Sequence, residues 1–234
     1  MGGEMQAQGE KAAASLVGWW VESGVDTAVA EQPRDWLGRN KAAPPIAQRA
    51  QVPVEAPADI AAFKEWLATA TGLPMDRPGA IRVAPYGVNG APLMLLSDLP
   101  SQEDAAEGRP IGGDAWALTV KMLAAIGIKA DEAYHASLSC FHAPGARIGK
   151  DELEACAAIA RDHVRLARPE WLILFGDAPS RALIGEPLAR ARGRVHKVEG
   201  VRTIATFNPR WLLQRPSDKA LAWRDLLLLM SESD

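Results

Sequence analysis

Three short segments of the chain carry polar side chains directly after apolar runs that are typical of strands. These segments are 97–101, 137–142 and 207–213. They contain the carboxylate of Asp98, the hydroxyl of Ser137 and the amide of Asn208, which are groups that orient water, move protons or hydrogen-bond a ligand. Ligands of open α/β sheets bind beyond the carboxyl ends of the strands, so the three segments are candidate functional sites. The alternative is that each segment is only a turn between a strand and a helix.

The elements that must position these segments alternate between apolar runs and helical patterns. Apolar runs that predict strands lie at 80–83, 93–96, 134–140, 171–175 and 201–207. Periodic patterns that predict helices lie at 59–67, 116–126, 151–167, 178–183 and 216–230. This alternation predicts an α/β fold, with a mostly parallel central sheet that is covered by helices on both faces.

The chain divides by composition into three parts. Residues 1–37 are expected to form an N-terminal helical extension, with Leu16, Trp19 and Trp20 on one side of its first helix. Residues 38–58 are rich in Pro and Ala and predict a linker, since prolines interrupt both helices and central strands. Residues 59–234 are expected to form the α/β domain.

The composition excludes several classes of protein. Two cysteines among 234 residues cannot supply a Cys₄ zinc site or a four-thiolate cluster, and the four histidines show no ligand spacing. We therefore expect no metal and no cofactor. The most apolar stretch, 12–21, is too short to span a membrane. We expect a cytoplasmic protein with reduced thiols that are small buried hydrophobes.

Several motifs follow one another along the chain: Gly-Arg-Pro-Ile-Gly-Gly at 108–113 with the helix that ends at Gly127, then residues 144–156, then residues 206–213. In this order they resemble the uracil-DNA glycosylase superfamily, in particular the family 4 enzymes that carry an iron–sulfur cluster. The first motif resembles the family's Gly-Arg-Pro-Phe-Val-Gly stretch and the helix after it, and the last resembles its His-Pro-Ala-x-Leu-Leu motif. The resemblance implies a three-layer α/β/α sandwich.

The resemblance also implies roles for two of the candidate residues. Asp98 stands where the family has its functional Glu, and a carboxylate there positions the attacking water or stabilises positive charge on the sugar. Asn208 stands where the family has a His, and its amide can donate a hydrogen bond to the departing base. The alternatives are that Asp98 caps the following helix and that Asn208-Pro209 is a turn.

The base pocket that the resemblance implies has changed. Leu99 and Pro100 follow Asp98 where the family has a Gly-Glu-x-Pro-Gly stretch, Ile111 replaces the Phe that stacks on the base, and Ser137 replaces the Asn that reads it. Trp116 also replaces a Gly. An open pocket at these positions would favour activity, and a pocket filled by Leu99, Ile111 or Trp116 would favour a protein without catalysis.

The cysteines depart from the family in the same way. Cys156 stands at the position of the last cluster ligand and Cys140 lies close to that of the third, but residues 63–83 contain no cysteine. The resemblance therefore does not extend to an iron–sulfur cluster.

Charge is distributed unevenly along the chain. Residues 181–215 carry eight cations and two carboxylates, a net charge of +6, whereas residues 1–60 carry five cations and eight carboxylates, a net charge of −3. A basic stretch beside Asn208 predicts contact with DNA phosphates, and the alternative is a solvated basic face. Within it, Arg210 and Arg215 are the expected phosphate contacts, and Trp211 or Leu212 the apolar wedge that enters the base stack. Alternatively, Leu213 and Trp211 belong to the core.

Three hypotheses follow for the function. The first is a divergent superfamily member that binds DNA and excises a damaged base by hydrolysing its N-glycosidic bond. The second is a catalytically inactive module that binds DNA or a repair protein, with the Trp-rich N-terminal helices as docking elements. The third is a glycosylase for a lesion other than uracil.

Overall fold

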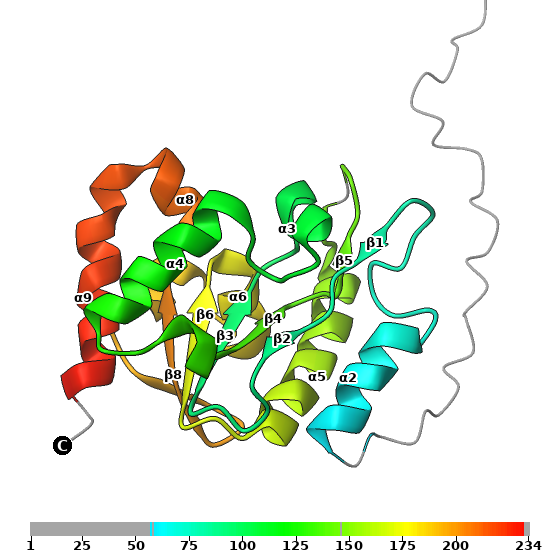
Figure 1. Cartoon of the computed structure of the whole chain (residues 1–234), viewed down its shortest axis with the longest axis horizontal. Coiled ribbons are helices and arrows are strands. Elements are labelled where there is room, and N and C mark those ends of the chain that lie inside the picture. The colour runs from blue at the N-terminus through cyan, green and yellow to red at the C-terminus, as the bar shows by residue number, and fades with distance from the viewer. Residues whose placement is uncertain (1–56, 58, 146, 232–234) are drawn as a thin grey trace, which may run out of the picture. The chain divides into compact units, whose positions relative to one another are not determined.

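The computed structural model describes residue 57 and residues 59–145 and 147–231 (Figure 1). The expected N-terminal helices and nearly all of the expected linker at 38–58 lie outside these residues. None of the described helices is long and apolar enough to cross a membrane.

A central sheet of six strands organises the domain, in the order β2-β4-β3-β6-β8-β7. The four inner strands run parallel, and the edge strands β2 and β7 pair antiparallel with β4 and β8. The six strands are β2 (Tyr86–Gly87), β3 (Leu93–Ser97), β4 (Tyr134–Ser137), β6 (Trp171–Phe175), β7 (His196–Val198) and β8 (Val201–Thr206). The mostly parallel sheet is as predicted.

Helices cover both faces of the sheet, which makes a three-layer α/β/α sandwich (Figure 1). One face is covered by α4 (Gly113–Ala125) and α9 (Lys219–Ser231), and the other by α5 (Lys150–Ala167), α6 (Asp177–Leu183) and α7 (Leu188–Ala191). The buried strand β3 supplies both layers, because alternate side chains point to opposite faces of a strand. Leu93 and Leu95 pack under α4 and α9, whereas Met94 and Leu96 pack under α5.

The remaining elements are short or lie outside the main sheet. Helix α2 (Ile60–Thr69) begins at Asp59, whose carboxylate caps two backbone amides, and packs on α5. A second sheet pairs β1 (Ile81–Arg82) with β5 (Phe141–His142). The others are α3 (Gln102–Glu107), α8 (Pro209–Gln214) and the 3₁₀ turns η1 (Ala130–Glu132) and η2 (Pro216–Asp218).

The structure corrects several sequence-based expectations. The run 134–140 is not one extended segment, because β4 ends at Ser137 and β5 begins only at Phe141. The expected helix 216–230 begins with a 3₁₀ turn, and α9 starts at Lys219. The helices α3 and α7 and the strands β2 and β7 were not predicted, because each has six residues or fewer and is too short for a periodic pattern.

Candidate active site at the carboxyl edge of the sheet

The parallel strands β3, β4, β6 and β8 end at the same edge of the sheet. Ser97 and Ser137 are paired in register, as are Phe175 and Thr206. The next residues therefore meet in space, although they are far apart in the chain. Asp98 follows β3, Gly176 follows β6, and Asn208 begins α8 just after β8.

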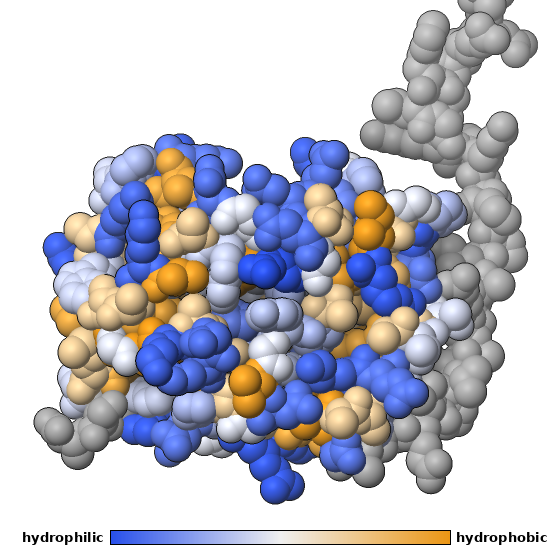
Figure 2. Space-filling model, viewed as in Figure 1, coloured by the Kyte–Doolittle hydropathy of each residue, from blue (hydrophilic) through white to orange (hydrophobic). Residues whose placement is uncertain are grey.

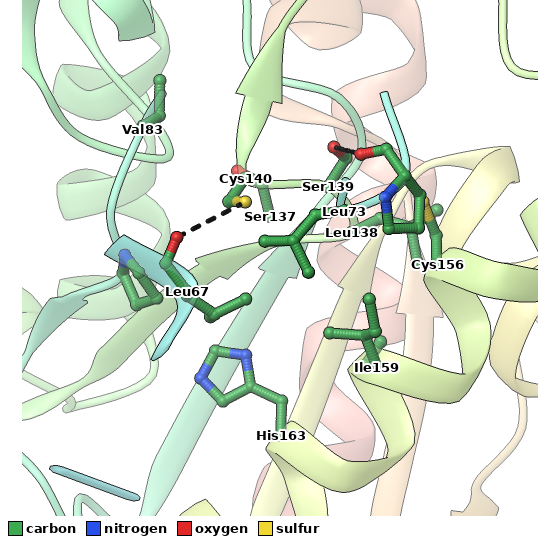
Figure 3. Close-up of a pocket in the computed structure, with 13 residues that line it drawn as sticks. Leu67, Leu73, Val83, Ser137, Leu138, Ser139, Cys140, Cys156, Ile159 and His163 are labelled. Atoms are coloured by element: carbon green, nitrogen blue, oxygen red, sulfur yellow. Dashed lines mark hydrogen bonds between the residues drawn. The ribbon is translucent and has the colours of Figure 1, made fainter. Parts of the chain in front are cut away.

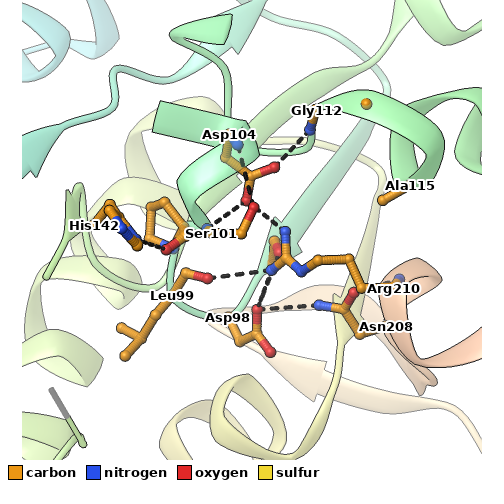
Figure 4. A network of polar contacts seen from close by, with 12 residues as sticks. Asp98, Leu99, Ser101, Asp104, Gly112, Ala115, His142, Asn208 and Arg210 are labelled. Atoms are coloured by element: carbon orange, nitrogen blue, oxygen red, sulfur yellow. Dashed lines mark hydrogen bonds and ion pairs between the residues drawn. The ribbon is translucent and has the colours of Figure 1, made fainter. Parts of the chain in front are cut away.

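Asp98 and Asn208 contact each other directly. Asn208 Nδ2 donates a hydrogen bond to Asp98 Oδ1 at 3.1 Å, and Asn208 Oδ1 accepts one from the backbone amide of Arg210 at 2.9 Å (Figure 4). Asn208 is therefore the N-cap of α8, and it is 7% exposed. Asp98 and Asn208 are thus brought together as predicted, and the turn that the alternative predicts at Asn208-Pro209 is also present, because Asn208 caps α8.

Asp98 does not cap the helix that follows it. The N-cap of α3 is Ser101, which forms a reciprocal capping box with Asp104. The alternative role for Asp98 is therefore wrong. Its side chain is 35% exposed and makes its contacts with α8 and not with the start of α3. Burial raises the pKa of Asp98 above its ordinary value, although the charge and hydrogen bond of Arg210 oppose the shift.

Arg210 lies inside the site and does not point away from it. Its Nη2 is 2.7 Å from Asp98 Oδ1 and 3.2 Å from the Leu99 carbonyl oxygen, and its Nη1 pairs with Asp104 (Figure 4). The Arg210 side chain is 23% exposed. We call this cluster of Asp98, Asp104, Asn208 and Arg210 the carboxylate edge.

The expected base-pocket residues are mostly buried. Ile111 is 2% exposed and belongs to the core under α4, and Pro100 is buried as well. Ser137 Oγ is buried and has no hydrogen-bond partner among the described residues. Leu99 is half-buried. The backbone next to Ser137 lies beside Asp98, because the Leu138 amide is 2.9 Å from the Ser97 carbonyl oxygen and 3.3 Å from that of Asp98. Trp116 packs edge-on against His135, with ring centroids 4.9 Å apart.

The two expected wedge residues have opposite exposures. Leu212 is 1% exposed, so its side chain is a core residue in this structure and not a surface wedge. Trp211 and Leu213, which the alternative placed in the core, are 39% and 40% exposed. Trp211 is held in place, because its Nε1 donates to Asp218 at 2.8 Å and the guanidinium of Arg215 lies 4.6 Å from its ring centroid.

Much of the basic stretch at 181–215 is engaged in contacts within the domain. Arg181 pairs with Asp177, Arg194 with Glu186, and Arg210 with the carboxylate edge. Arg192 pairs at 3.0 Å with Asp225, a carboxylate of α9 that is 0% exposed and that also accepts from Thr206 at 2.8 Å. The +6 of the sequence is therefore an upper limit on the charge that this surface offers to phosphates.

Sequence reasoning missed two buried carboxylates that support the site. Asp104 lies three residues after Ser101, and this Ser-x-x-Asp spacing is the signal of a capping box that would have revealed both α3 and Asp104. Asp225 is the acidic residue within the apolar run of α9, a position that calls for a cationic partner. Asp225 holds Arg192, whose guanidinium lies 4.8 Å from the Phe207 ring centroid, beside Asn208.

The comparisons with known proteins identify the superfamily to which the chain belongs. The model of the uracil DNA glycosylase superfamily matches residues 84–227, which include every member of the carboxylate edge. The chain belongs to the uracil-DNA glycosylase superfamily. A type-4 uracil-DNA glycosylase of Archaeoglobus fulgidus is 24% identical over 141 residues, which are 56% of this chain and 71% of that protein.

An iron–sulfur cluster like that of the resembled family 4 enzymes would need thiolate ligands from this chain. Cys140 and Cys156 are the only thiols of the chain, and both line a small cavity of about 20 Å³ between α2, α5 and the residues after β4 (Figure 3). We call this cavity and its lining the thiol pocket. A cluster needs four thiolates, so the donors present do not fit one.

The chemistry of the thiol pocket also opposes metal binding. Burial raises the pKa of Cys140 to about 11 and that of Cys156 to about 12, so both are neutral thiols at pH 7, whereas metals bind thiolates. The described residues contain no group of three or more Cys, His, Asp or Glu side chains that could hold a metal ion. The other lining side chains are largely apolar, and include Leu67, Leu73 and Ile159.

Proposed function

We propose that this chain excises a damaged base from DNA by hydrolysing the N-glycosidic bond, with Asp98 and Asn208 as its catalytic residues. The observation that carries the proposal is the 3.1 Å hydrogen bond between these two side chains at the carboxyl edge of the sheet. Residues from two motifs, 110 positions apart in the chain, thus form one site of the kind that superfamily membership leads one to expect.

The two side chains divide the reaction between them. Asp98 orients a water molecule toward the sugar carbon and stabilises the positive charge that grows there as the bond to the base breaks. Asn208 Nδ2 has two N–H groups, and only one is used by Asp98. The second N–H has no acceptor among the described residues and can donate to the departing base, which leaves with the electron pair of the broken bond.

The DNA surface of the proposal centres on α8. Trp211 is exposed and fixed by Asp218 and Arg215, so it can fill the gap in the base stack with little loss of side-chain entropy. Arg215 is exposed beside it and is placed to contact a phosphate. The lesion remains open in this proposal, because Ile111 and Ser137 differ from the residues that the resembled family uses on uracil.

The experiment is a panel of duplexes that carry uracil, hypoxanthine or xanthine, followed by alkaline cleavage of abasic sites. The wild type is expected to give product on at least one duplex, and Asp98→Ala is expected to abolish it. Absence of product on every duplex would overturn the proposal.

A second candidate is a module that binds DNA, or a repair protein through residues 1–37, without excising a base. Two observations favour it: the Ile111 side chain is only 2% exposed, and Arg210 already pairs with Asp98. Salt-dependent binding of the same duplexes without product would select this candidate. Arg215→Ala is expected to lower the slope of affinity against salt concentration in either case.

A further inference from the structure

Arg210 joins two carboxylates that lie on different segments of the chain. Its planar guanidinium uses one terminal nitrogen for Asp104 and the other for Asp98 and the Leu99 carbonyl (Figure 4). An arginine makes this double contact from two separate nitrogens that are held in one plane, whereas a lysine would have to make both contacts from its single nitrogen. Geometry as well as positive charge therefore favours an arginine at this position.

Asp104 is the fixed end of this arrangement. It is 0% exposed, its Oδ2 accepts from the Ser101 amide at 2.7 Å, and its Oδ1 accepts from the Gly112 amide at 2.6 Å. Asp104 thus contacts the start of α3 and the loop before α4, and through Arg210 it is connected to the start of α8. A buried carboxylate with this many donors is held rigidly, because each lost partner would leave an unsatisfied charge.

Asp98 is held by only one of its two oxygens. Asn208 Nδ2, Arg210 Nη2 and, at 3.4 Å, Ser97 Oγ all donate to Oδ1. Oδ2 accepts no hydrogen bond from the described residues. It faces Gly176, where a Cβ would lie 3.5 Å from it and where φ is +107°, a conformation that favours glycine.

We infer that Asp104 and Arg210 are positioning residues, which fix Oδ1 of Asp98 so that Oδ2 is presented to the reacting water. This inference rests on the proposed function. We call the contact of Asp104 with Arg210, and of Arg210 with Asp98, the brace. The brace orients the Asp98 carboxylate, and the substrate completes the hydrogen bonds of Oδ2. It differs from the phosphate contact that the sequence predicts for Arg210, because the guanidinium acts on protein carboxylates and not on DNA.

The test separates rate from binding in three variants of the full chain. Arg210→Lys keeps the charge but loses the fork, Asp104→Asn loosens the fixed end, and Arg165→Met is the control. Arg165 is an exposed arginine of α5 that pairs with Asp162, so the control removes a surface ion pair elsewhere. Single-turnover excision at saturating DNA gives the rate, and fluorescence anisotropy of the labelled duplex gives the Kd.

The brace predicts a rate that falls about 10- to 100-fold in Arg210→Lys and Asp104→Asn, with Kd and salt slope within about twofold of the wild type. A higher Kd with an unchanged rate at saturation would overturn the brace and assign Arg210 to a phosphate. A rate that rises would also overturn it, since Arg210 would then be blocking Asp98.

A spectroscopic measurement keeps the inference testable if the wild type excises no base. The ¹³C resonance of the Asp98 carboxyl is titrated in the wild type, Arg210→Met and Arg165→Met. Loss of the Arg210 charge and hydrogen bond, which both lower the pKa of Asp98, is expected to raise the titration midpoint of Asp98, with no change in the control. An unchanged midpoint in Arg210→Met would overturn the brace, whereas a shifted midpoint without excision would overturn only the proposed function.

Discussion

The thiol pocket lies at the end of β4 and the carboxylate edge begins at the end of the neighbouring strand β3, yet the two regions treat buried polar groups in opposite ways. In the thiol pocket the groups are neutral. Burial keeps Cys140 and Cys156 protonated and lowers the pKa of His163 to about 3, and His163 Nε2 lies 2.7 Å from the Tyr134 hydroxyl. In the carboxylate edge the groups are charged and paired.

This difference indicates which of the two regions can bind a polar ligand. A neutral, apolar pocket stabilises the fold through packing, and the ring centroids of Phe63 and His163 are 4.7 Å apart. A cluster of two carboxylates and one guanidinium, one carboxylate oxygen of which has no partner among the described residues, is ready to bind a further polar group. We therefore propose that the thiol pocket serves the stability of the fold and that the carboxylate edge serves its function.

The largest effect that this comparison predicts is on the free energy of unfolding. Phe63 is 1% exposed beside the thiol pocket, and Phe63→Ala is expected to lower the free energy of unfolding by about 3–5 kcal/mol through lost burial and a new cavity. Urea denaturation measures it. Ile81→Ala, at a side chain 49% exposed, is the control and is expected to change it by less than about 0.5 kcal/mol. Equal effects would show that the thiol pocket is not a packed core.

The next effect is a pH dependence of stability that originates in the thiol pocket. The folded pKa of His163, about 3, lies below its ordinary value of 6.5, so the unfolded state binds a proton first. The stabilising contribution is complete above pH 6.5 and is lost as the pH falls toward 3, by up to about 1.4 kcal/mol per pH unit. Unfolding at pH 7, 6 and 5 measures the slope. His163→Gln is expected to flatten it, and an identical slope in this variant would contradict the neutral buried ring.

The smallest of these effects concerns the surface next to the carboxylate edge. Trp211→Ala is expected to weaken binding to a lesion duplex about tenfold, because one aromatic stacking contact with a base is worth about 1–3 kcal/mol. Trp211→Phe, which keeps an aromatic ring, is expected to retain most of the affinity. Fluorescence anisotropy decides, and equal affinities of the wild type and Trp211→Ala would remove α8 from the proposed DNA surface.

The sequence predicted the fold well, because buried parallel strands are read as apolar runs. The runs at 93–96 and 171–175 correspond to β3 and β6, and the regular periodicity at 151–167 corresponds to α5. The elements it missed have few residues and few apolar positions, as in Gln102–Glu107. Such segments become helical through capping and through contacts made by the rest of the fold.

The site was predicted only in part. That Asp98 and Asn208 lie together follows from the rule that parallel strands end at one edge of the sheet. In the structure, Asn208 Nδ2 is 3.1 Å from Asp98 Oδ1. The role of Arg210 did not follow, since a sequence shows its charge but not the direction of its side chain. The exposures of Leu212 and Trp211 were equally inaccessible, because a six-residue helix buries whichever side chain the packing of its neighbours selects.

The most direct test of the account compares one substitution from each region on the excision rate. Asp98→Asn removes the carboxylate, and the double variant Cys140→Ala/Cys156→Ala removes both thiols of the thiol pocket. On the duplex that the wild type cleaves best, Asp98→Asn is expected to lower the single-turnover rate by about 10²–10³-fold, and the double variant to keep it within about twofold. A rate that survives Asp98→Asn, or that falls as far in the double variant, would contradict the assignment of function to the carboxylate edge.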